Sequence, residues 1–237
     1  MPFSPFLLPR SWGFDTIHAF TGTDAARLLA TPFPGQPLVC LWRYVSLGVP
    51  SPADITAAER DAILGAGWKL GLVQHVQRPS WQADPASGLS HGAAAVAHAQ
   101  LVGYPPGCHL GLDMEGLGDH GAPVLGYVVA WADAAHAAGY RVLMYEGYDD
   151  GLTDAEHQAL SDGGYVDAWW SDYGPRTLPQ SLRFAMKQHA QTTVAGIGVD
   201  PDEVLIAGAI AVMGLASDAP TDPAPPMPHE DTTEPHS

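Results

Sequence analysis

Residues 109–116 read His-Leu-Gly-Leu-Asp-Met-Glu-Gly, an apolar run of strand length that ends in two acidic residues and a glycine. Two other runs, Leu-Gly-Leu-Val at 70–73 and Val-Leu-Met-Tyr at 142–145, are also almost continuously apolar. Parallel strands that are covered by helices on both faces have this composition. The three runs therefore predict core strands of an α/β protein.

Helix-like stretches separate these apolar runs along the chain. Thr-Ala-Ala-Glu at 56–59 fits a capping box, and the helical patterns over 90–103 and 123–139 each end at a glycine. Regular alternation of strands and helices predicts βα units. Eight strands in one domain favour a closed (β/α)8 barrel, a TIM barrel, over an open doubly wound sheet. The expected strands are 12–20, 38–45, 69–76, 109–116, 141–148, 166–173, 183–191 and 198–204.

The barrel is expected to occupy residues 1–216 as a single α/β domain. The remaining stretch, 217–237, is rich in proline and has five acidic residues, no aromatic residue and no Lys or Arg. Such a composition buries too little apolar surface to offset chain entropy, so we expect a disordered tail. The apolar segment 204–215 is too short to span a bilayer and is expected to form a buried helix.

The charge balance limits the possible partners. Ten Lys and Arg residues against 26 Asp and Glu give a formal net charge of −16, which disfavours binding to nucleic acid or to anionic membranes. Cys40 and Cys108 lie in apolar runs and are expected to be buried free thiols. Residues 1–10 show no recognisable signal peptide, so we expect a protein that is cytoplasmic or released by a non-classical, phage-type route. We also expect a monomer.

Four acidic residues stand at or near the ends of expected strands, where barrel enzymes build their active sites. Asp15 lies in the first strand, Asp113 and Glu115 lie in the fourth, and Asp200 lies in the eighth. The first and eighth strands are neighbours in a closed barrel. We therefore expect these carboxyl groups to converge at the mouth of the barrel.

Asp113 and Glu115 are the most informative pair. Positions i and i+2 of a strand share one face, with Cα atoms about 6.6 Å apart at ~3.3 Å rise per residue. Two carboxyl groups this close do not both ionise freely, so one keeps its proton and can act as a general acid while the other stays anionic. Glycoside hydrolysis requires this division of labour.

Several motifs resemble family 25 glycoside hydrolases, the lysozyme-like muramidases. Gly-Phe-Asp at 13–15 resembles their first-strand Asp, and Leu-Asp-Met-Glu at 112–115 their Asp-x-Glu motif. Trp-Ser-Asp-Tyr at 170–173 is similar to a sixth-strand Trp-x-x-Tyr, and Lys-Gln-His at 187–189 to a seventh-strand Gln. Val-Asp-Pro-Asp at 199–202 is similar to the terminal Val-Asp-x-Asn, with Asp202 in place of the Asn.

The first half of the chain resembles more closely the related glycoside-hydrolase-like domain of unknown function 1906. The resemblance as a whole covers about residues 12–205, and it rests on the order and spacing of its motifs together. The segments that follow the order of that domain are 42–44, 55–59, 90–92, 97–103, 127–131 and 139–141.

The resemblance to family 25 implies roles for the acidic residues. Glu115 would be the general acid, Asp113 would position the substrate or stabilise charge, and Asp15 and Asp200 would complete the acidic pocket. The implied reaction is cleavage of the muramic-acid glycosidic bond of peptidoglycan, with retention and with help from the acetamido group of the substrate.

Other side chains could bind the sugar. Aromatic rings offer platforms for sugar faces, and strand alternation together with the family match favours Trp170 over Trp169 as the inward-facing ring. We expect no metal, because His-x-x-His and His-Glu-x-x-His spacings are missing, and no cofactor. The candidate substrate-binding residues are Trp170, Tyr145, Tyr148, Gln188, Glu146 and Trp81.

Three functions remain open at this point. The first is an N-acetylmuramidase-like glycosidase that acts on peptidoglycan or a related amino-sugar polysaccharide. The second is a catalytically inactive glycan-binding or structural module of a secreted or phage-derived assembly. The third is a different barrel hydrolase or isomerase that uses the same carboxyl groups, because a fold alone does not define a reaction.

Overall fold

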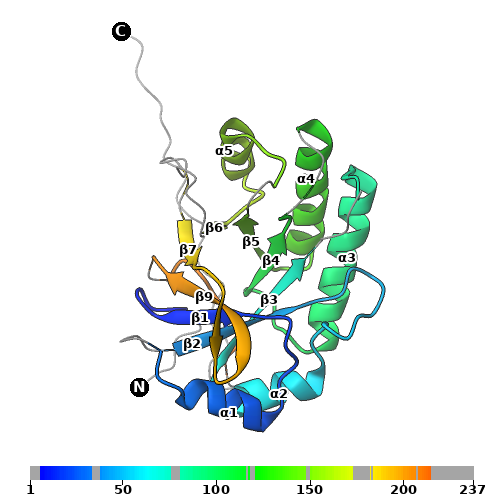
Figure 1. Ribbon diagram of the computed structural model, residues 1–237. Helices are drawn as coiled ribbons and strands as arrows, with labels where there is room; N and C mark the ends of the chain where they lie inside the picture. The colour runs from blue at the N-terminus through cyan, green and yellow to red at the C-terminus, as the bar shows by residue number, and fades with distance from the viewer. Residues whose placement is uncertain are drawn as a thin grey trace.

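The computed structural model describes residues 6–33, 38–75, 81–115, 117, 121–147, 150–172, 182, 184–206 and 208–214. Strands and helices alternate through most of this part of the chain (Figure 1). The described strands are β1 (Trp12–Asp15), β2 (Leu38–Tyr44), β3 (Lys69–His75), β4 (His109–Asp113), β5 (Arg141–Glu146), β6 (Ala168–Ser171), β7 (Phe184–Gln188), β8 (Thr192–Val194) and β9 (Ile197–Val204). The described helices are α1 (Gly22–Ala30), α2 (Ala57–Gly65), α3 (Pro85–Leu101), α4 (Ala122–Ala137) and α5 (Asp154–Asp162).

The strands form a closed barrel, which confirms the predicted α/β barrel fold. β1 to β7 pair in sequence order as parallel neighbours, and β9 joins β7 to β1 and so closes the ring. The last strand differs from the expectation, because β9 runs antiparallel to both β7 and β1. It follows β8 in a hairpin, and Ala195 and Gly196 take positive φ angles in the turn between them.

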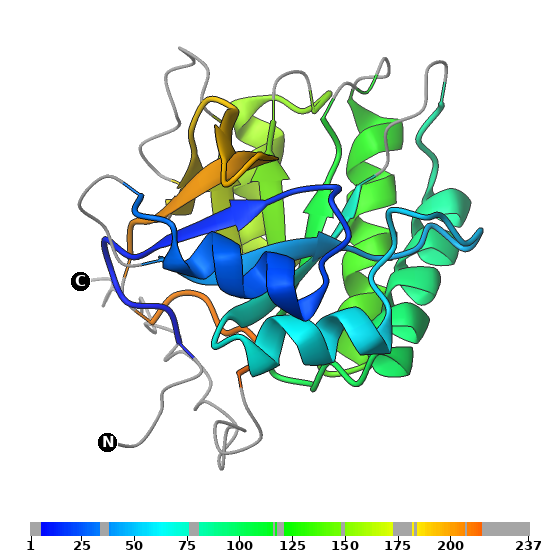
Figure 2. The ribbon, with the colours of Figure 1, turned by 60° about the horizontal axis from the view of Figure 1, so that its bottom comes forward.

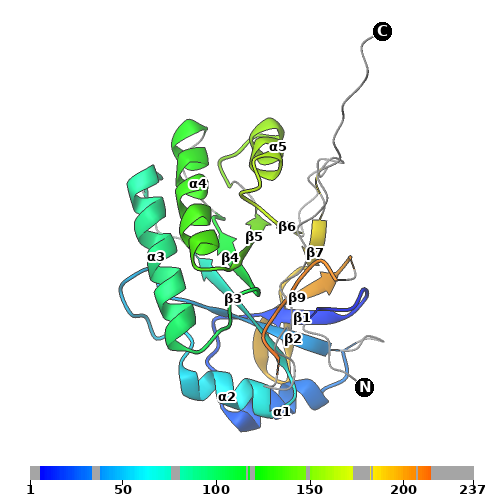
Figure 3. The same ribbon diagram turned by 180° about the vertical axis from the view of Figure 1, so that it is seen from behind.

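Four of the five described helices pack in two pairs against the outside of the barrel. α1 and α2 lie next to each other below the first strands (Figure 2), and α3 and α4 run side by side (Figure 3). Two glycines of α3 allow this second contact. A Cβ atom at Gly88 would lie 2.3 Å from the Tyr127 carbonyl oxygen, and one at Gly92 would lie 2.8 Å from the Trp131 carbonyl oxygen.

Two separate apolar clusters make up the core. The larger one joins the outer faces of the strands to the helices. The other contains no helix residue and draws on β2, β3, β5, β6, β7 and β9, so it fills the barrel interior. Its buried members are Leu7, Cys40, Trp42, Val73, Leu143, Tyr145, Ala168, Trp170, Ala185, Met186, Val204, Ile210 and Val212. Both cysteines are buried free thiols, as expected.

The segment that follows β9 is not the helix predicted for 204–215, and that prediction was wrong. Gly208 has φ +70°, which interrupts any continuous helix. Beyond it, alternate residues Ile210 and Val212 enter the interior cluster. The residues that alternate with them, Ala211 and Met213, pair with chain segments at the amino end of the barrel, through bridges Phe6↔Ala211 and Leu70↔Met213. We call this closed end, made with Leu7, the floor of the barrel.

Helix starts also differ from expectation in detail. Thr56 caps α2 by accepting a hydrogen bond from the Glu59 N–H, but Glu59 does not complete the predicted capping box. Its carboxylate instead forms a buried ion pair with Arg43. The predicted helix 90–103 begins earlier, at Pro85, after a capping box between Asp84 and Ser87.

Within the described segments, no helix combines the length and apolar character needed to cross a membrane. The predicted tail at 217–237 lies outside the described residues. The same holds for parts of the predicted strands, including Tyr148.

Candidate active site

The carboxyl ends of the parallel strands meet at the rim opposite the floor, and we call this rim the mouth. Asp15 is the last residue of β1, and Asp113 is the last residue of β4. Asp200 reaches the mouth in an unexpected way. Because β9 is antiparallel, its early part lies at this rim, and Asp200 is the register partner of Asp15. The carboxyl groups of the first and last strands therefore meet, although the predicted direction of the last strand was wrong.

Two contacts hold the Asp113 carboxylate. His75, its register partner at the end of β3, places Nδ1 against Asp113 Oδ2. The Glu115 N–H donates a hydrogen bond of 2.9 Å to Asp113 Oδ1. Because β4 ends at Asp113, Glu115 is oriented by this turn and not by the strand alternation that the sequence suggested.

Glu115 has the electrostatic character of a general acid. Its burial, followed by the negative charge of Asp113, raises the pKa of Glu115 to about 7. Its side chain lies against Gly147, where an added Cβ would fall 2.8 Å from the Glu115 Cβ. Glu115 thus holds its proton close to neutral pH while remaining only partly buried, and both properties suit proton donation to a substrate.

Asp15 lies at the centre of a chain of hydrogen bonds. Tyr44 Oη donates to Asp15 Oδ1 over 3.3 Å, and Gln188 Nε2 donates to Oδ2 over 2.9 Å. Tyr145 Oη in turn donates to Gln188 Oε1 over 2.6 Å. Burial and the nearby Asp200 raise the pKa of Asp15 to about 8 against the opposing effect of these bonds. Asp15 is therefore mostly a neutral acid at pH 7.

Asp202 lies deeper in the barrel than the carboxyl groups of the mouth. It is two residues beyond Asp200 on β9, opposite Gly13 of β1, and its exposed fraction is 0%. Among the described residues, no donor makes a hydrogen bond of regular geometry to either carboxyl oxygen, although the indole of Trp170 lies near enough to oppose part of the rise in pKa. Burial, followed by the charge of Asp15, raises the pKa of Asp202 well above its ordinary value.

The structure brings some of the candidate sugar-binding residues to the barrel interior. Trp170 packs between Trp42 and Tyr145, with ring centroids 5.3 and 5.2 Å away, and Trp169 faces the helices as expected. Trp170 and Tyr145 are each only 2% exposed. As placed, their rings therefore form the base beneath the mouth, while Gln188 lies at the level of Asp15.

Other candidates lie away from these carboxyl groups. Trp81 packs against Tyr127 beside α3 and α4, with centroids 4.9 Å apart. Glu146 alternates with the inward-facing Tyr145, so it shares the outer face of β5 with Met144 of the larger cluster. Tyr148 lies outside the described residues.

Three residues of the mouth received no role from the sequence. His75 and Tyr44 contact Asp113 and Asp15 through pairings that depend on strand register, which the sequence does not supply. Asp172 follows β6 and raises the pKa of Glu115. Alternation offered a signal for Asp172, because it stands two residues after the inward-facing Trp170. Within the described ranges, no group of three or more His, Cys, Asp or Glu is arranged to hold a metal ion.

A βα barrel with clustered carboxyl groups at its mouth, two of which have pKa values raised to about 7 and about 8, has the architecture of a glycoside-hydrolase-like protein. The family model for the Rv2525c-like, glycoside hydrolase-like domain matches residues 36–204. Since this match covers well over half of the chain, the chain belongs to that family. A comparison with curated proteins gave no significant match.

Solved structures share the fold. An uncharacterized protein of B. stearothermophilus superposes with a TM-score of 0.62 at 22% identity, over 82% of this chain and 95% of that one. The Mycobacterium tuberculosis Tat-secreted protein Rv2525c in complex with L-tartrate gives 0.63 at 16% identity, over 86% and 98%. A muramidase from Acremonium alcalophilum gives 0.54 at 16% identity, over 82% and 93%.

Proposed function

We propose that this protein is a glycosidase that cleaves peptidoglycan or a related amino-sugar glycan at the mouth of the barrel. The observation that carries the proposal is Glu115, whose pKa is raised to about 7 by burial and by the adjacent Asp113. Glycosidases need one protonated and one anionic carboxyl group beside the bond they break. The similarity in fold to a muramidase supports the choice of an amino-sugar polymer.

Each carboxyl group has a separate task in the proposed reaction. Glu115 donates its proton to the glycosidic oxygen as the bond breaks. Asp113 supplies negative charge beside the oxocarbenium-like sugar, and His75 and the Glu115 N–H fix its position. Asp15, protonated at neutral pH, can donate a hydrogen bond to a sugar oxygen, with Asp200 next to it.

The reaction should depend on pH through Glu115. As pH rises through about 7, Glu115 loses the proton that the leaving group requires, so kcat/KM should fall tenfold per pH unit above that value. A pH series of initial rates on soluble peptidoglycan fragments measures this limb. An activity that stays level up to pH 9 would assign the acid role to another group.

The decisive experiment compares the parent with Glu115→Gln on insoluble peptidoglycan, with released sugars identified by mass spectrometry. The parent should release fragments with new muramic-acid reducing ends, and the variant should lose at least 100-fold in rate. Glu203→Gln is the matched control, because Glu203 lies on the outer face of β9 beside His189. If neither the parent nor Glu115→Gln releases sugar while both sediment with the glycan, the mouth is a binding site without turnover.

A further inference from the structure

A pocket of about 230 Å³ opens beside the mouth, and two of its lining residues also belong to the mouth. Tyr44 donates to Asp15 and His75 contacts Asp113, and their rings meet edge to face with centroids 5.7 Å apart. The rest of the lining is mainly aliphatic, with Ser51 and Asp54 as its polar members. Ile17 is 72% exposed and Val49 is 67% exposed.

These exposed side chains are unusual for this molecule. In the described part of the chain only six large apolar side chains are exposed, and two of the six line this one pocket. A hollow lined mainly by apolar side chains with a few polar groups is the usual form of a ligand pocket. Leu47 and Val45 extend the same surface inward.

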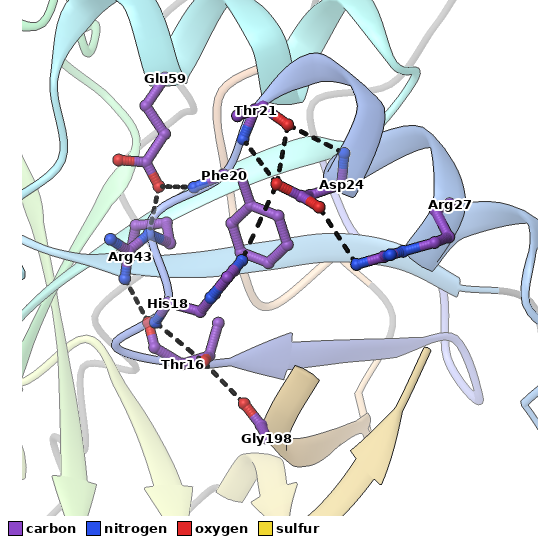
Figure 4. A network of polar contacts seen from close by, with 9 residues as sticks. All are labelled: Thr16, His18, Phe20, Thr21, Asp24, Arg27, Arg43, Glu59 and Gly198. Carbon is purple, nitrogen blue, oxygen red and sulfur yellow. Dashed lines mark hydrogen bonds and ion pairs between the residues drawn. The ribbon is translucent and has the colours of Figure 1, made fainter. Parts of the chain in front are cut away.

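The buried ion pair between Arg43 and Glu59, drawn with the contact of Arg43 to Thr16 in Figure 4, holds two loops that line the pocket. Arg43 Nε donates to Glu59 Oε1 over 2.6 Å, with both side chains almost completely buried. The same guanidinium donates through Nη1 to the carbonyl oxygen of Thr16, next to Ile17, and through Nη2 to that of Ala53 over 3.0 Å. Arg43 therefore ties the β1–α1 loop to the loop that carries Val49.

The second loop, residues 46–54, is held at several further points. Ser46 N–H donates to His98 Nδ1 over 2.8 Å, and Gln74 Nε2 donates to the Ser46 carbonyl oxygen over 2.7 Å. Ser51 N–H donates to Asp54 Oδ2 over 2.8 Å. Such a frame lets the pocket bind a ligand without the entropy cost of ordering a flexible loop.

We propose that this pocket is a subsite for the aliphatic substituent of one amino sugar, bound next to the glycosidic bond that the mouth acts on. The inference rests on the proposed function, because it takes a glycan as the ligand. A sugar that bears only hydroxyl groups gains little from an aliphatic wall, whereas an acyl methyl or a lactyl side chain can bury apolar surface there. The volume suits one such group and not a long polymer segment.

Binding to Glu115→Gln tests the subsite apart from turnover. The probes are two neutral β-1,4 tetrasaccharides, tetra-N-acetylchitotetraose and cellotetraose, which differ in the acetamido group, and a muropeptide that carries the lactyl ether. Calorimetry should show preference for a substituted sugar over cellotetraose. Adding the Ile17→Ser and Val49→Ser substitutions should weaken binding of the preferred ligand about tenfold. The affinity for cellotetraose should stay the same. Leu89→Ser, another exposed apolar residue, is the control.

The pattern of binding identifies the substituent. If the protein prefers tetra-N-acetylchitotetraose and the two serine substitutions abolish this preference, the pocket binds an N-acyl group. If the protein prefers only the muropeptide, the pocket binds the lactyl or peptide part. The proposal is overturned if no probe is preferred over cellotetraose, or if the preference survives both serine substitutions. These outcomes are independent of catalysis, which the release of reducing ends by the parent measures separately.

Discussion

At the scale of single residues, the burial of the Asp202 carboxyl group leads to the clearest prediction about stability. This carboxyl group keeps its proton to higher pH in the folded barrel than in the unfolded chain, because burial raises its pKa well above the ordinary 3.8. In the unfolded chain it ionises above about pH 4. The folded state therefore loses relative stability as pH rises from 4 toward the folded-state pKa, by up to about 1.4 kcal/mol per pH unit.

Asp202→Asn removes this titration and resembles the residue that family 25 motifs carry at this position. Its free energy of unfolding, measured by urea denaturation, should exceed that of the parent by an increasing amount as pH rises from about 4 toward the folded-state pKa of Asp202. Asp133→Asn, at an exposed position of α4, is the control and should show a constant difference. A difference for Asp202→Asn that does not change with pH would mean that Asp202 is ionised in the folded protein.

The close packing around Gly147 leads to a second prediction at this scale, which concerns activity. A methyl group there would stand 2.6 Å from Tyr145 Cε1 and 2.8 Å from Glu115 Cβ, so the Glu115 side chain has to move. Displacement of a catalytic group by about 1 Å can lower the rate ~100-fold. Overpacking lowers the free energy of unfolding by about 1–3 kcal/mol, which is less than a typical total of about 5–15 kcal/mol. Gly147→Ala should therefore fold and lose most of the proposed glycosidase activity.

Gly198→Ala is the matched control for that variant, because a Cβ at Gly198 meets nothing within 4 Å. It should retain the kcat of the parent on the same glycan. Equal activity of the two alanine variants would show that the position of Glu115 does not limit the reaction.

At the scale of elements, the contact between α3 and α4 depends on glycine. A Cβ at Gly92 would lie 2.8 Å from the Trp131 carbonyl oxygen, and backbone atoms cannot yield as a flexible side chain can. Gly92→Ala should lower the free energy of unfolding by about 1–3 kcal/mol in spite of its better helix propensity. Gly65→Ala, in α2 with open space around it, should be neutral or stabilising by up to about 1 kcal/mol. Denaturant unfolding of both variants tests the contact.

The positions of the strands and helices were partly predictable from the sequence. Long apolar runs located the strands of the barrel, and glycines marked helix ends. The short helices α1 and α5 were missed, although capping boxes at Thr21–Asp24 and Thr153–Glu156 precede them. The direction of β9 was not predictable from its apolar pattern, because that pattern is the same for a parallel and an antiparallel strand.

The site was predictable to the extent that strand position determines it. Asp15, Asp113 and Asp200 occupy the mouth because each lies near one end of a barrel strand, and Gln188 joins Asp15 there. The contact between His75 and Asp113 depends on register between neighbouring strands, and the burial of Trp170 depends on packing across the barrel. Neither appears in a one-dimensional pattern.

At the scale of the whole molecule, the net charge of −16 predicts how salt would affect the proposed reaction. Peptidoglycan with its associated polymers is anionic and should repel this protein at low ionic strength. The Debye length falls from about 30 Å at 0.01 M to about 8 Å at 0.15 M salt, so the rate on insoluble peptidoglycan should rise several-fold over that range. The rate on a neutral oligosaccharide, the control, should stay constant. If instead the rate on the anionic polymer falls as salt is added, the protein contacts the polymer through a cationic surface.

The floor of the barrel has a consequence for synthesis of the protein. Leu7 N–H donates to the Ile210 carbonyl oxygen over 3.1 Å, and Met213 exchanges backbone hydrogen bonds with Leu70. All the barrel strands precede Ile210 in sequence, so every one of them leaves the ribosome before the residues that seal the floor. Until then the base of the interior cluster stays open to water, and the nascent chain completes its hydrophobic core only when one of its last described segments meets one of its first.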